Sequence, residues 1–314
     1  MSRTPLAVAV DIGGTKIAVG LVDAQGRLHE QRRTATPAAE GGQAIMAAVL
    51  DCARPLLDLG GDRVLACGVA TAGVVDAAGR IASATDLLSG WAGTDVKGAA
   101  EQGLGLPAVV VNDCHAAGTA EARTGAARGA RTALVVAVGT GIGGALVSGG
   151  VTVTGRSGTA GAIGHVPAPG VAGRRCSCGA AGHVEAHASG PAIERSYQEL
   201  TGQALGLRRI ASLARSGDPR ACQVITGAAT LLGQVLGGAA NLLDPDVIVI
   251  AGGVSRLGSL LLGPARRAFR AEALPGPRGI PIRAAALGER AGLVGAGLTA
   301  LHAHARVGGA PVVR

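Results

Sequence analysis

Two aspartates of this chain directly follow apolar segments, in positions where a carboxylate can do chemistry. Asp11 follows the run 6–10, and Asp113 follows the run 108–111 and Asn112. Apolar runs that end in polar or turn-forming residues are typical of buried strands. At such a strand end, Asp11 can orient Mg²⁺, and Asp113 can accept the proton of a hydroxyl that attacks a phosphoryl group. The simpler alternatives are a turn-forming Asp11 and a helix-capping Asp113.

Glycine-rich turns follow three of the apolar runs and suit the binding of phosphate. They read GGTK at 13–16, GTGIGG at 139–144 and AGG at 251–253. Because glycine has no Cβ, backbone N–H groups in such turns can approach phosphate oxygens closely. The expected nucleotide and phosphate ligands are Asp11, Gly13, Gly14, Thr15, Lys16, Gly139, Thr140, Gly141, Gly143, Gly252 and Gly253.

Two common nucleotide-binding motifs do not fit these turns. The chain has no Gly-Lys-Ser/Thr at the spacing of a P-loop. GTGIGG does match G-x-G-x-x-G, but an apolar strand follows it, and no Asp or Glu stands between Glu121 and Glu185. Since a dinucleotide fold needs a helix and then an acid about 20 residues further on, we set that interpretation aside.

A cluster of sulfur and nitrogen ligands is predicted near the middle of the chain. Its members are His165, Cys176, Cys178 and His183. Two thiolates and two imidazoles suit tetrahedral Zn²⁺, and a full set of protein ligands implies a structural ion. The alternative is a pair of reduced surface cysteines. The other cysteines are far apart in sequence and are expected as small buried residues: Cys52, Cys67, Cys114 and Cys222.

Strands and helices must alternate to position these residues, which predicts an α/β architecture. We expect strands at 6–10, 17–22, 64–70, 108–111, 133–138, 145–147 and 247–250, and helices at 42–59, 190–200, 219–243 and 290–304. The segment 149–182 is expected to be an irregular loop held by a bound ion. A strand, glycine turn and strand at 6–22 recur at 133–147, and this duplication predicts two related lobes. The expected small lobe is 1–115 with the C-terminal helix at about 289–314, and the expected large lobe is 116–288.

Composition excludes several classes of protein. Hydrophobic residues make up 48% of the 314 residues but aromatic residues only 1%, which argues against stacking platforms for nucleic acid. The net charge of +8 comes from scattered arginines, and pairs such as Arg208-Arg209 are expected on solvated helix faces. The positive net charge suits the binding of an anionic small molecule such as a nucleotide. No uninterrupted apolar run reaches the length of a membrane span, and the cysteines form no disulfide framework, so we expect a cytoplasmic protein without a membrane partner.

With these motifs in place, the chain resembles the ROK family (repressors, open reading frames and sugar kinases), in particular its bacterial glucokinase-like members. Some features are shared with bacterial N-acetylmannosamine kinases. The resemblance runs from about Leu6 to His302. It rests on DIGGTK at 11–16, Asn112-Asp113 with Glu121 downstream, GTGIGG, Gly164-His165, the C-x-C-G at 176–179, Glu185, and AGG at 251–253.

The resemblance implies an actin-like ATPase or hexokinase fold, with two lobes that each hold a mixed β-sheet flanked by helices and a zinc-stabilised loop in the larger lobe. It implies that Asp113 is the catalytic base and that Asn112, Asp113, His165, Glu185 and the loop around Gly73 bind the sugar, His165 also binding zinc. The implied cofactors are ATP with Mg²⁺ and a structural Zn²⁺. A homodimer or homotetramer is the implied assembly.

Three departures from the family pattern bear on the substrate. Ala162 stands where E-x-G-H has its sugar-binding Glu, His183 replaces the third zinc cysteine, and the loop 69–73 lacks the common G-x-P-G. We expect a kinase that transfers the γ-phosphate of MgATP to the 6-hydroxyl of glucose or an amino-substituted glucose such as kanosamine or glucosamine. The alternatives are an N-acetylmannosamine kinase and a sugar-binding regulator with little kinase activity. A repressor is not expected, because the first strand begins within the first ten residues and leaves no room for a helix-turn-helix segment.

Overall fold

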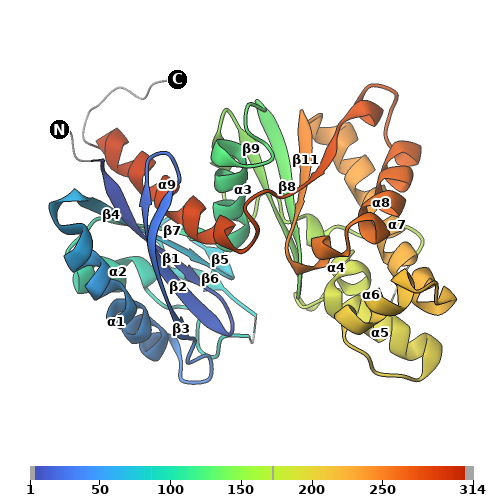
Figure 1. The fold of residues 1–314 in the computed structure, drawn as a ribbon, viewed down its shortest axis with the longest axis horizontal. Helices are drawn as coiled ribbons and strands as arrows, with labels where there is room; N and C mark the ends of the chain where they lie inside the picture. Colours follow the sequence, from blue (N-terminus) through green and yellow to red (C-terminus); the bar gives the residue numbers. More distant parts are fainter. Residues whose placement is uncertain (1–3, 86, 172, 308–314) are drawn as a thin grey trace. The chain divides into compact units, whose positions relative to one another are not determined.

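The structure is a computed structural model that describes residues 4–85, 87–171 and 173–307. The chain divides into two compact units, and each is described by itself (Figure 1). Unit 1 comprises residues up to 128 together with 154–160 and the chain from Glu289 onward, and unit 2 comprises 129–153 and 161–288. Residues 116–128, which the sequence assigns to the large lobe, therefore belong to unit 1. The expected lobe ends at 1–3 and 308–314 lie outside the described residues.

Unit 1 is built on a mixed sheet of five strands in the order β3-β2-β1-β4-β7. The strands are β1 (Leu6–Ile12), β2 (Lys16–Asp23), β3 (Leu28–Ala35), β4 (Val64–Thr71) and β7 (Ala108–Asn112). β1 pairs with β2 in antiparallel fashion, whereas β1, β4 and β7 run parallel, with Ile12 opposite Thr71 and Thr71 opposite Asn112. The carboxyl ends of the three parallel strands therefore meet at one edge of the sheet.

Helices cover both faces of this sheet (Figure 1). They are α1 (Gly42–Gly60), α2 (Val96–Leu104), α3 (Asp113–Thr124) and α9 (Ala291–Val307). Successive strand residues point to opposite faces, so Val8 and Val10 pack with the core of α1 and α2, while Ala9 packs with α3 and α9. Small residues let α3 and α9 pack closely together. If a Cβ atom were added to Gly295 of α9, it would lie only 1.8 Å from the carbonyl oxygen of Ala116 in α3.

Unit 2 repeats this plan with a sheet in the order β10-β9-β8-β11-β12. Its strands are β8 (Thr132–Val138), β9 (Ile142–Ser148), β10 (Val151–Val153), β11 (Val247–Ala251) and β12 (Ile282–Ala284). Its helices are α4 (Glu185–Ala188), α5 (Gly190–Thr201), α6 (Leu207–Arg215), α7 (Pro219–Leu243) and α8 (Ser259–Glu272). The first two strands of the two duplicated segments form the hairpins β1–β2 and β8–β9, which hold the same place in their sheets. The predicted fold class and duplication are thereby confirmed.

Helix α7 is long and apolar enough, by length and composition, to cross a membrane. More than half of its most apolar window, 56%, is buried in the structure. Leu232, Leu236 and other residues of α7 join the main core cluster of unit 2. This burial is typical of the core helix of a globular unit, where one side must be apolar to pack.

Some elements differ from the sequence-based expectations. β3, β12, α6 and α8 were not predicted, and β9 begins at Ile142 rather than at 145, so Gly143 and Gly144 lie within a strand. β3 reads LHEQRRTA and is mostly exposed at the sheet edge, so it lacks the apolar pattern that marks a buried strand. The expected loop 149–182 contains the short β10 and a 3-10 turn, η2 (Ile163–His165), but is otherwise irregular as predicted.

Candidate active site

The β1–β2 turn is held in shape by bonds that leave part of its backbone available. The N–H of Gly13 donates to the carbonyl of Lys16 at 3.0 Å, and the hydroxyl of Thr36 donates to the carbonyl of Gly13 at 2.7 Å. Gly14 and Thr15 are exposed at the tip. Within the described chain, the N–H groups of Gly14 and Thr15 have no backbone partner outside the strand ladders. Such N–H groups form the kind of concavity that binds phosphate. Thr36 was missed in the sequence because it stands 23 residues from Gly13.

Asn112, not Asp113, caps helix α3. The side-chain oxygen of Asn112 accepts the N–H groups of Cys114 at 2.9 Å and His115 at 3.3 Å. Its amide nitrogen donates to the carbonyl of Gly73 at 3.0 Å. Because Asn112 accepts the N–H groups of the first turn of α3, it is the N-cap residue, and the alternative in which Asp113 caps the helix is wrong. Asp113 is the first residue of the helix, and its carboxylate accepts the N–H of Cys114 at 2.8 Å.

Burial raises the pKa of both aspartates of unit 1. Burial, together with the neighbouring Asp113 carboxylate, raises the pKa of Asp11 from 3.8 to about 7, although Lys16 opposes the rise. Burial also raises the pKa of Asp113, against hydrogen bonds from Cys114 that lower it. Two carboxylates that share a poorly solvated site cannot both ionise easily. Perturbed acids of this kind are common in functional sites, because a general base works best with a pKa near the operating pH.

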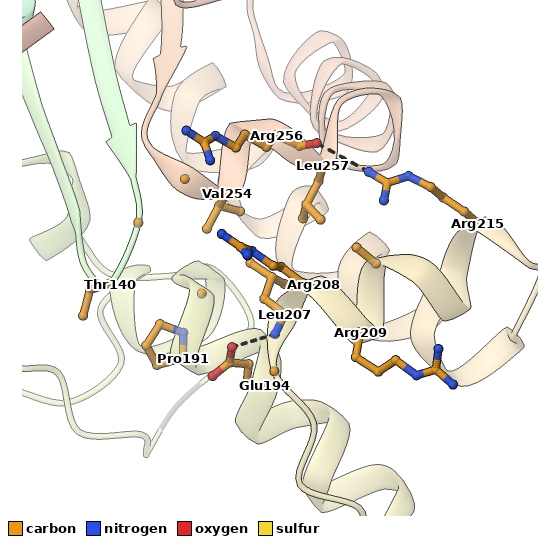
Figure 2. A pocket seen from close by; sticks show the side chains of 15 residues that line it. Thr140, Pro191, Glu194, Leu207, Arg208, Arg209, Arg215, Val254, Arg256 and Leu257 are labelled. Carbon is orange, nitrogen blue, oxygen red and sulfur yellow. Dashed lines mark hydrogen bonds between the residues drawn. The ribbon is translucent and has the colours of Figure 1, made fainter. Parts of the chain in front are cut away.

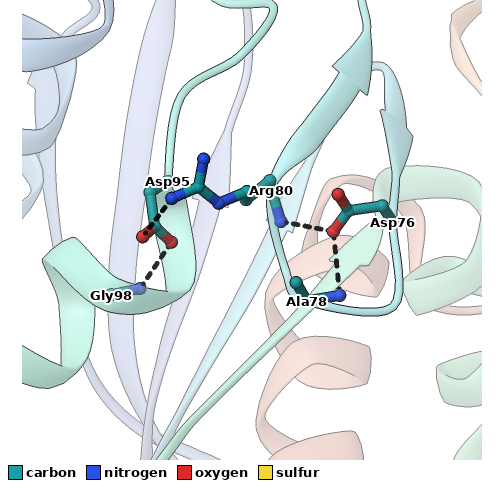
Figure 3. Close-up of polar contacts among 5 residues, drawn as sticks. All are labelled: Asp76, Ala78, Arg80, Asp95 and Gly98. Carbon is teal, nitrogen blue, oxygen red and sulfur yellow. Dashed lines mark hydrogen bonds and ion pairs between the residues drawn. The ribbon is translucent and has the colours of Figure 1, made fainter.

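A small hairpin follows Gly73 and is pinned by polar contacts (Figure 3). It consists of β5 (Val74–Val75) and β6 (Ile81–Ser83), joined by a turn in which the carboxylate of Asp76 accepts the N–H groups of Ala78 and Arg80. Arg80 pairs with Asp95 at 3.2 Å, and Asp95 also caps α2 through the N–H of Gly98. Gly73 itself has a φ of 100°, which favours glycine. The sugar loop expected around Gly73 is therefore braced by α2 and by Asn112.

In unit 2, the β8–β9 turn is held from both of its ends. The N–H of Gly190 donates to the carbonyl of Gly139 at 2.8 Å, and the N–H of Ile142 donates to the carboxylate of Glu185 at 2.9 Å. Thr140 and Gly141 are exposed between these anchors. Gly252, at the end of β11, has a φ of 83°, and a Cβ there would lie 2.4 Å from the carbonyl oxygen of Val138. Only glycine allows these two strand ends to approach in this way.

A cavity of about 920 Å³ in unit 2 opens beside this turn (Figure 2). Its lining includes Gly139, Thr140, Gly190, Gly253, Val254, Leu257, Leu207, Glu194 and four arginines, Arg208, Arg209, Arg215 and Arg256. The carboxylate of Glu194 accepts the N–H of Leu207 at 2.7 Å. Figure 2 shows the guanidinium groups of Arg208 and Arg256 on the side of Val254, whereas that of Arg209 points away. The sequence-based interpretation placed Arg208-Arg209 together on a solvated face; both are exposed and both line the cavity, but a single sequence cannot tell which guanidinium group faces it.

The predicted sulfur and nitrogen ligands come together. The potential ligand atoms of His165, Cys176, Cys178 and His183 all lie within 4.8 Å of one another. Nδ1 of His165 is 3.4 Å from Sγ of Cys176, and Nδ1 of His183 is 3.3 Å from Sγ of Cys178. Zn–N and Zn–S bonds of about 2.0–2.3 Å give tetrahedral edges of about 3.3–3.8 Å, so these spacings fit a shared ion.

The expected sugar ligands of unit 2 are His165, which is itself a member of this cluster, and Glu185, which contacts it through Cys176. His165 ends η2, which begins after Ala162. Glu185 is 8% exposed, and its carboxylate accepts the hydroxyl of Ser177 at 2.5 Å as well as the N–H of Ile142. Burial alone would raise the pKa of Glu185, but these hydrogen bonds outweigh it and hold the pKa below 4.5. Ser177 was missed in the sequence, although it stands inside the C-x-C.

Comparisons with known proteins agree with this architecture. The model of the ROK family matches residues 7–303. A glucokinase from Halalkalibacterium halodurans is 32% identical, over 92% of this chain and 93% of its own length. An N-acetylmannosamine kinase from Shigella boydii is 34% identical over 79% of this chain and 82% of its own.

One similar solved structure contains bound ligands. It is a ROK family glucokinase from Streptomyces griseus in complex with glucose and AMPPNP, 34% identical, with a TM-score of 0.81 over 95% of this chain and 99% of its own. The family model and these relatives cover nearly all of the motifs described above. The chain therefore belongs to the ROK family.

Proposed function

We propose that this protein is an ATP-dependent hexose kinase that uses Asp113 as its general base. The observation that carries the proposal is the arrangement within unit 1. Burial and the nearby Asp113 carboxylate raise the pKa of Asp11, and burial raises the pKa of Asp113. Both residues lie at the carboxyl edge of parallel strands, beside a turn with exposed backbone N–H groups. A sugar hydroxyl is a poor nucleophile, and a carboxylate of raised pKa can accept its proton as the phosphoryl group is transferred.

In each unit, the glycine turn is a proposed ligand for the phosphates of the donor. Asp11 would orient Mg²⁺, which supplies charge neutralisation at the transferred phosphate. In unit 2, Gly139 and Thr140 of the β8–β9 turn and Gly253, which follows β11, line the arginine-rich cavity. This cavity has the size and charge for a nucleoside triphosphate. The related glucokinase in complex with glucose and AMPPNP supports this role. Asn112, Gly73, His165 and Glu185 remain proposed sugar ligands.

The cluster of His165, Cys176, Cys178 and His183 is proposed to bind a structural Zn²⁺. Their spacing fits tetrahedral coordination, and the soft sulfur donors favour zinc over Mg²⁺. The loop has little regular structure of its own. Its contacts include the N–H of Cys176 to the carbonyl of Ala180 at 2.8 Å, the hydroxyl of Ser177 to the carboxylate of Glu185 at 2.5 Å, and Arg174 to the hydroxyl of Ser196 at 2.9 Å. An ion that joins its ends would therefore contribute directly to its folding.

The acceptor is proposed to be glucose or an amino-substituted glucose such as kanosamine or glucosamine, phosphorylated at the 6-hydroxyl. The first curated relative above is a glucokinase, which supports a hexose. A second candidate is N-acetylmannosamine, supported by the N-acetylmannosamine kinase relative and by Ala162, which leaves room where the family has a glutamate. A regulator with little turnover is the remaining alternative, and two partly buried aspartates of raised pKa at strand ends speak against it.

A coupled ADP-release assay with MgATP tests the proposal. Glucose, glucosamine, kanosamine, mannose, N-acetylmannosamine and N-acetylglucosamine are compared by kcat/KM. Turnover with one sugar well above the others would support the kinase and identify its acceptor. If none of the sugars is turned over while a sugar still binds, the kinase proposal is wrong and the regulator is favoured.

The substitution Ala162→Glu serves as the specificity control in this assay. A charge-assisted hydrogen bond to a sugar hydroxyl is worth about 1.5–3 kcal/mol. If the missing carboxylate is what weakens glucose binding, Ala162→Glu should lower KM for glucose about 10- to 150-fold. The same variant should not improve turnover of an N-acetylated sugar, whose bulk would meet the new side chain.

Two further expectations complete the proposal. A cytoplasmic location suits the free cysteines, none of which is disulfide-bonded among the described residues. A homodimer or homotetramer remains a prediction from the family resemblance.

A further inference from the structure

Residues 154–160 form a loop that belongs to unit 1, although the chain on both sides of it belongs to unit 2. The loop reads TGRSGTA, and the N–H of Ala160 closes it by donating to the carbonyl of Thr154 at 3.1 Å. Arg156, Ser157 and Thr159 are exposed, and the two hydroxyl oxygens lie 3.0 Å apart. The loop therefore offers polar side chains from a position inside unit 1.

His115 attaches this loop to helix α3. It is the third residue of the helix, two residues after Asp113, and it is only 5% exposed. Its Nε2 lies 2.8 Å from the carbonyl oxygen of Ala160, which stands 45 residues further along the chain. Because a carbonyl oxygen can only accept, Nε2 carries the proton in this bond. The end of the loop is thus bonded to the first turn of the helix that carries the proposed base.

The loop also contacts the hairpin of β5 and β6. A Cβ atom added at Gly158 would lie only 2.5 Å from the carbonyl oxygen of Val75, so the two backbones pack closely. Val75 stands two residues after Gly73, whose carbonyl accepts the amide of Asn112 at 3.0 Å. The loop therefore touches both elements that the bond between Asn112 and Gly73 joins, namely α3 and the hairpin.

We infer that residues 154–160 form a wall of the sugar site in unit 1, and that His115 is the positioning residue that holds this wall in place. The inference rests on the proposed function, in which Asn112 and Gly73 bind the sugar and Asp113 takes its proton. The hydroxyl and guanidinium groups of the loop can form hydrogen bonds with sugar hydroxyls. Because both contacts of the loop lie beside the proposed sugar ligands, displacement of the loop should weaken binding of the sugar rather than of the phosphate donor.

A pair of substitutions at His115 tests the inference through separate KM values. His115→Leu removes the donor and keeps an apolar side chain in a buried position. We expect KM for the sugar to rise about 3- to 10-fold, as for the loss of one neutral hydrogen bond, while KM for ATP stays within about twofold. In His115→Gln the side-chain amide can place an N–H group near the position of Nε2, so KM for the sugar should return to within about twofold of the wild-type value.

His302→Leu is the matched control for this pair. The ring of His302 lies 3.3 Å from the guanidinium of Arg123, near the other end of α3, and both KM values should stay within about twofold in this variant. The inference is wrong if His115→Leu raises the two KM values equally, or if it lowers kcat with KM for the sugar unchanged. The second result would mean that His115 acts on the neighbouring Asp113 and not on the loop.

Gly158→Ala displaces the loop without a change in α3, and it serves in case His115→Leu does not fold. Its new Cβ would meet the carbonyl of Val75, and KM for the sugar should rise about threefold or more. Gly150→Ala is the control, because Gly150 has the same φ of 75° but a Cβ there would have nothing within 4 Å. Equal effects of the two substitutions would show that backbone strain, and not the position of the loop, changes KM.

Trypsin cleavage after Arg156 supplies a readout that does not depend on activity. Arg156 is exposed within the loop, and cleavage at such a site reports how firmly the loop is held. We expect faster cleavage in His115→Leu than in the wild-type protein or in His302→Leu, and slower cleavage of the wild-type protein when sugar is bound. Equal rates in the wild-type protein and His115→Leu, or a bound sugar that gives no protection, would overturn the inference.

The two readouts also separate this inference from the proposed function. If the wild-type protein binds and turns over none of the sugars, the proposed function fails, and the sugar-site role of the loop fails with it. The cleavage rates of His115→Leu and His115→Gln still decide whether His115 holds the loop.

Discussion

Replacement of Asp11 by Asn should make the protein more stable while it destroys activity. Asp11 is partly buried near Asp113, and its carboxylate is crowded by α9: a Cβ atom added at Gly292, in the first turn of that helix, would lie only 2.8 Å from Oδ2 of Asp11. Ionisation in this crowded site is costly in the absence of bound Mg²⁺. The amide of Asn has nearly the same shape but carries no charge, so it avoids that cost.

The magnitude follows from the pKa of Asp11. A rise from 3.8 to about 7 corresponds to about 4 kcal/mol at about 1.4 kcal/mol per pH unit. Since the folded state holds a proton that the unfolded state has released, wild-type stability falls as pH rises from about 4 to about 7. The stability advantage of Asp11→Asn should therefore be near zero at pH 4, grow across this window, and reach up to about 4 kcal/mol above pH 7.

Denaturant unfolding at pH 5, 6, 7 and 8, in buffer with a chelator of Mg²⁺, measures this advantage. Asp51→Asn is the matched control, because Asp51 is an exposed aspartate of the same unit and its replacement should change stability by no more than about 0.5 kcal/mol. Turnover of Asp11→Asn should be lost under every condition. A variant that is less stable than the wild type at pH 8, or whose advantage does not grow with pH, would refute the account of Asp11 as a strained functional acid.

Three other predictions follow from the site. Asp113→Asn should lower kcat about 10²- to 10⁴-fold with sugar binding intact. In the wild-type protein, kcat should fall as pH drops through the raised pKa of Asp113. Near-normal turnover in the variant would show that Asp113 is not the general base. Metal analysis should find about one zinc per chain. Removal of the metal by a chelator and the substitution Cys178→Ser should each lower Tm, because the ion contributes to folding. Purified wild-type protein without metal would contradict the zinc site. Arg208→Ala should raise KM for ATP about tenfold. Arg209→Ala is the control and should change this KM less than twofold, because the guanidinium of Arg209 points away from the cavity. Equal effects of the two substitutions would show that the cavity does not bind the donor through Arg208.

Much of the fold can be predicted from local sequence pattern alone. Apolar runs that end at glycine turns located the strands around Asp11 and the GTGIGG turn, because buried strands need continuous apolar residues and phosphate turns need glycine. Helix α7 begins and ends where predicted, since Asp218 caps it, accepting the N–H of Ala221 at 2.7 Å, and Pro219 starts it. The metal cluster was also predicted, because its ligands stand close together in sequence.

Other features depend on partners far apart in the sequence, and these only the tertiary structure decided. The polar strand β3 exists because β2 offers it an edge to pair with, and Asn112 rather than Asp113 caps α3 because the carbonyl of Gly73 fixes its amide. The same holds for Glu185, whose bond to Ile142 spans 43 residues. Residue type and spacing determine which groups the chain can offer, whereas the hydrogen bonds that a buried group actually makes depend on which elements fold against it.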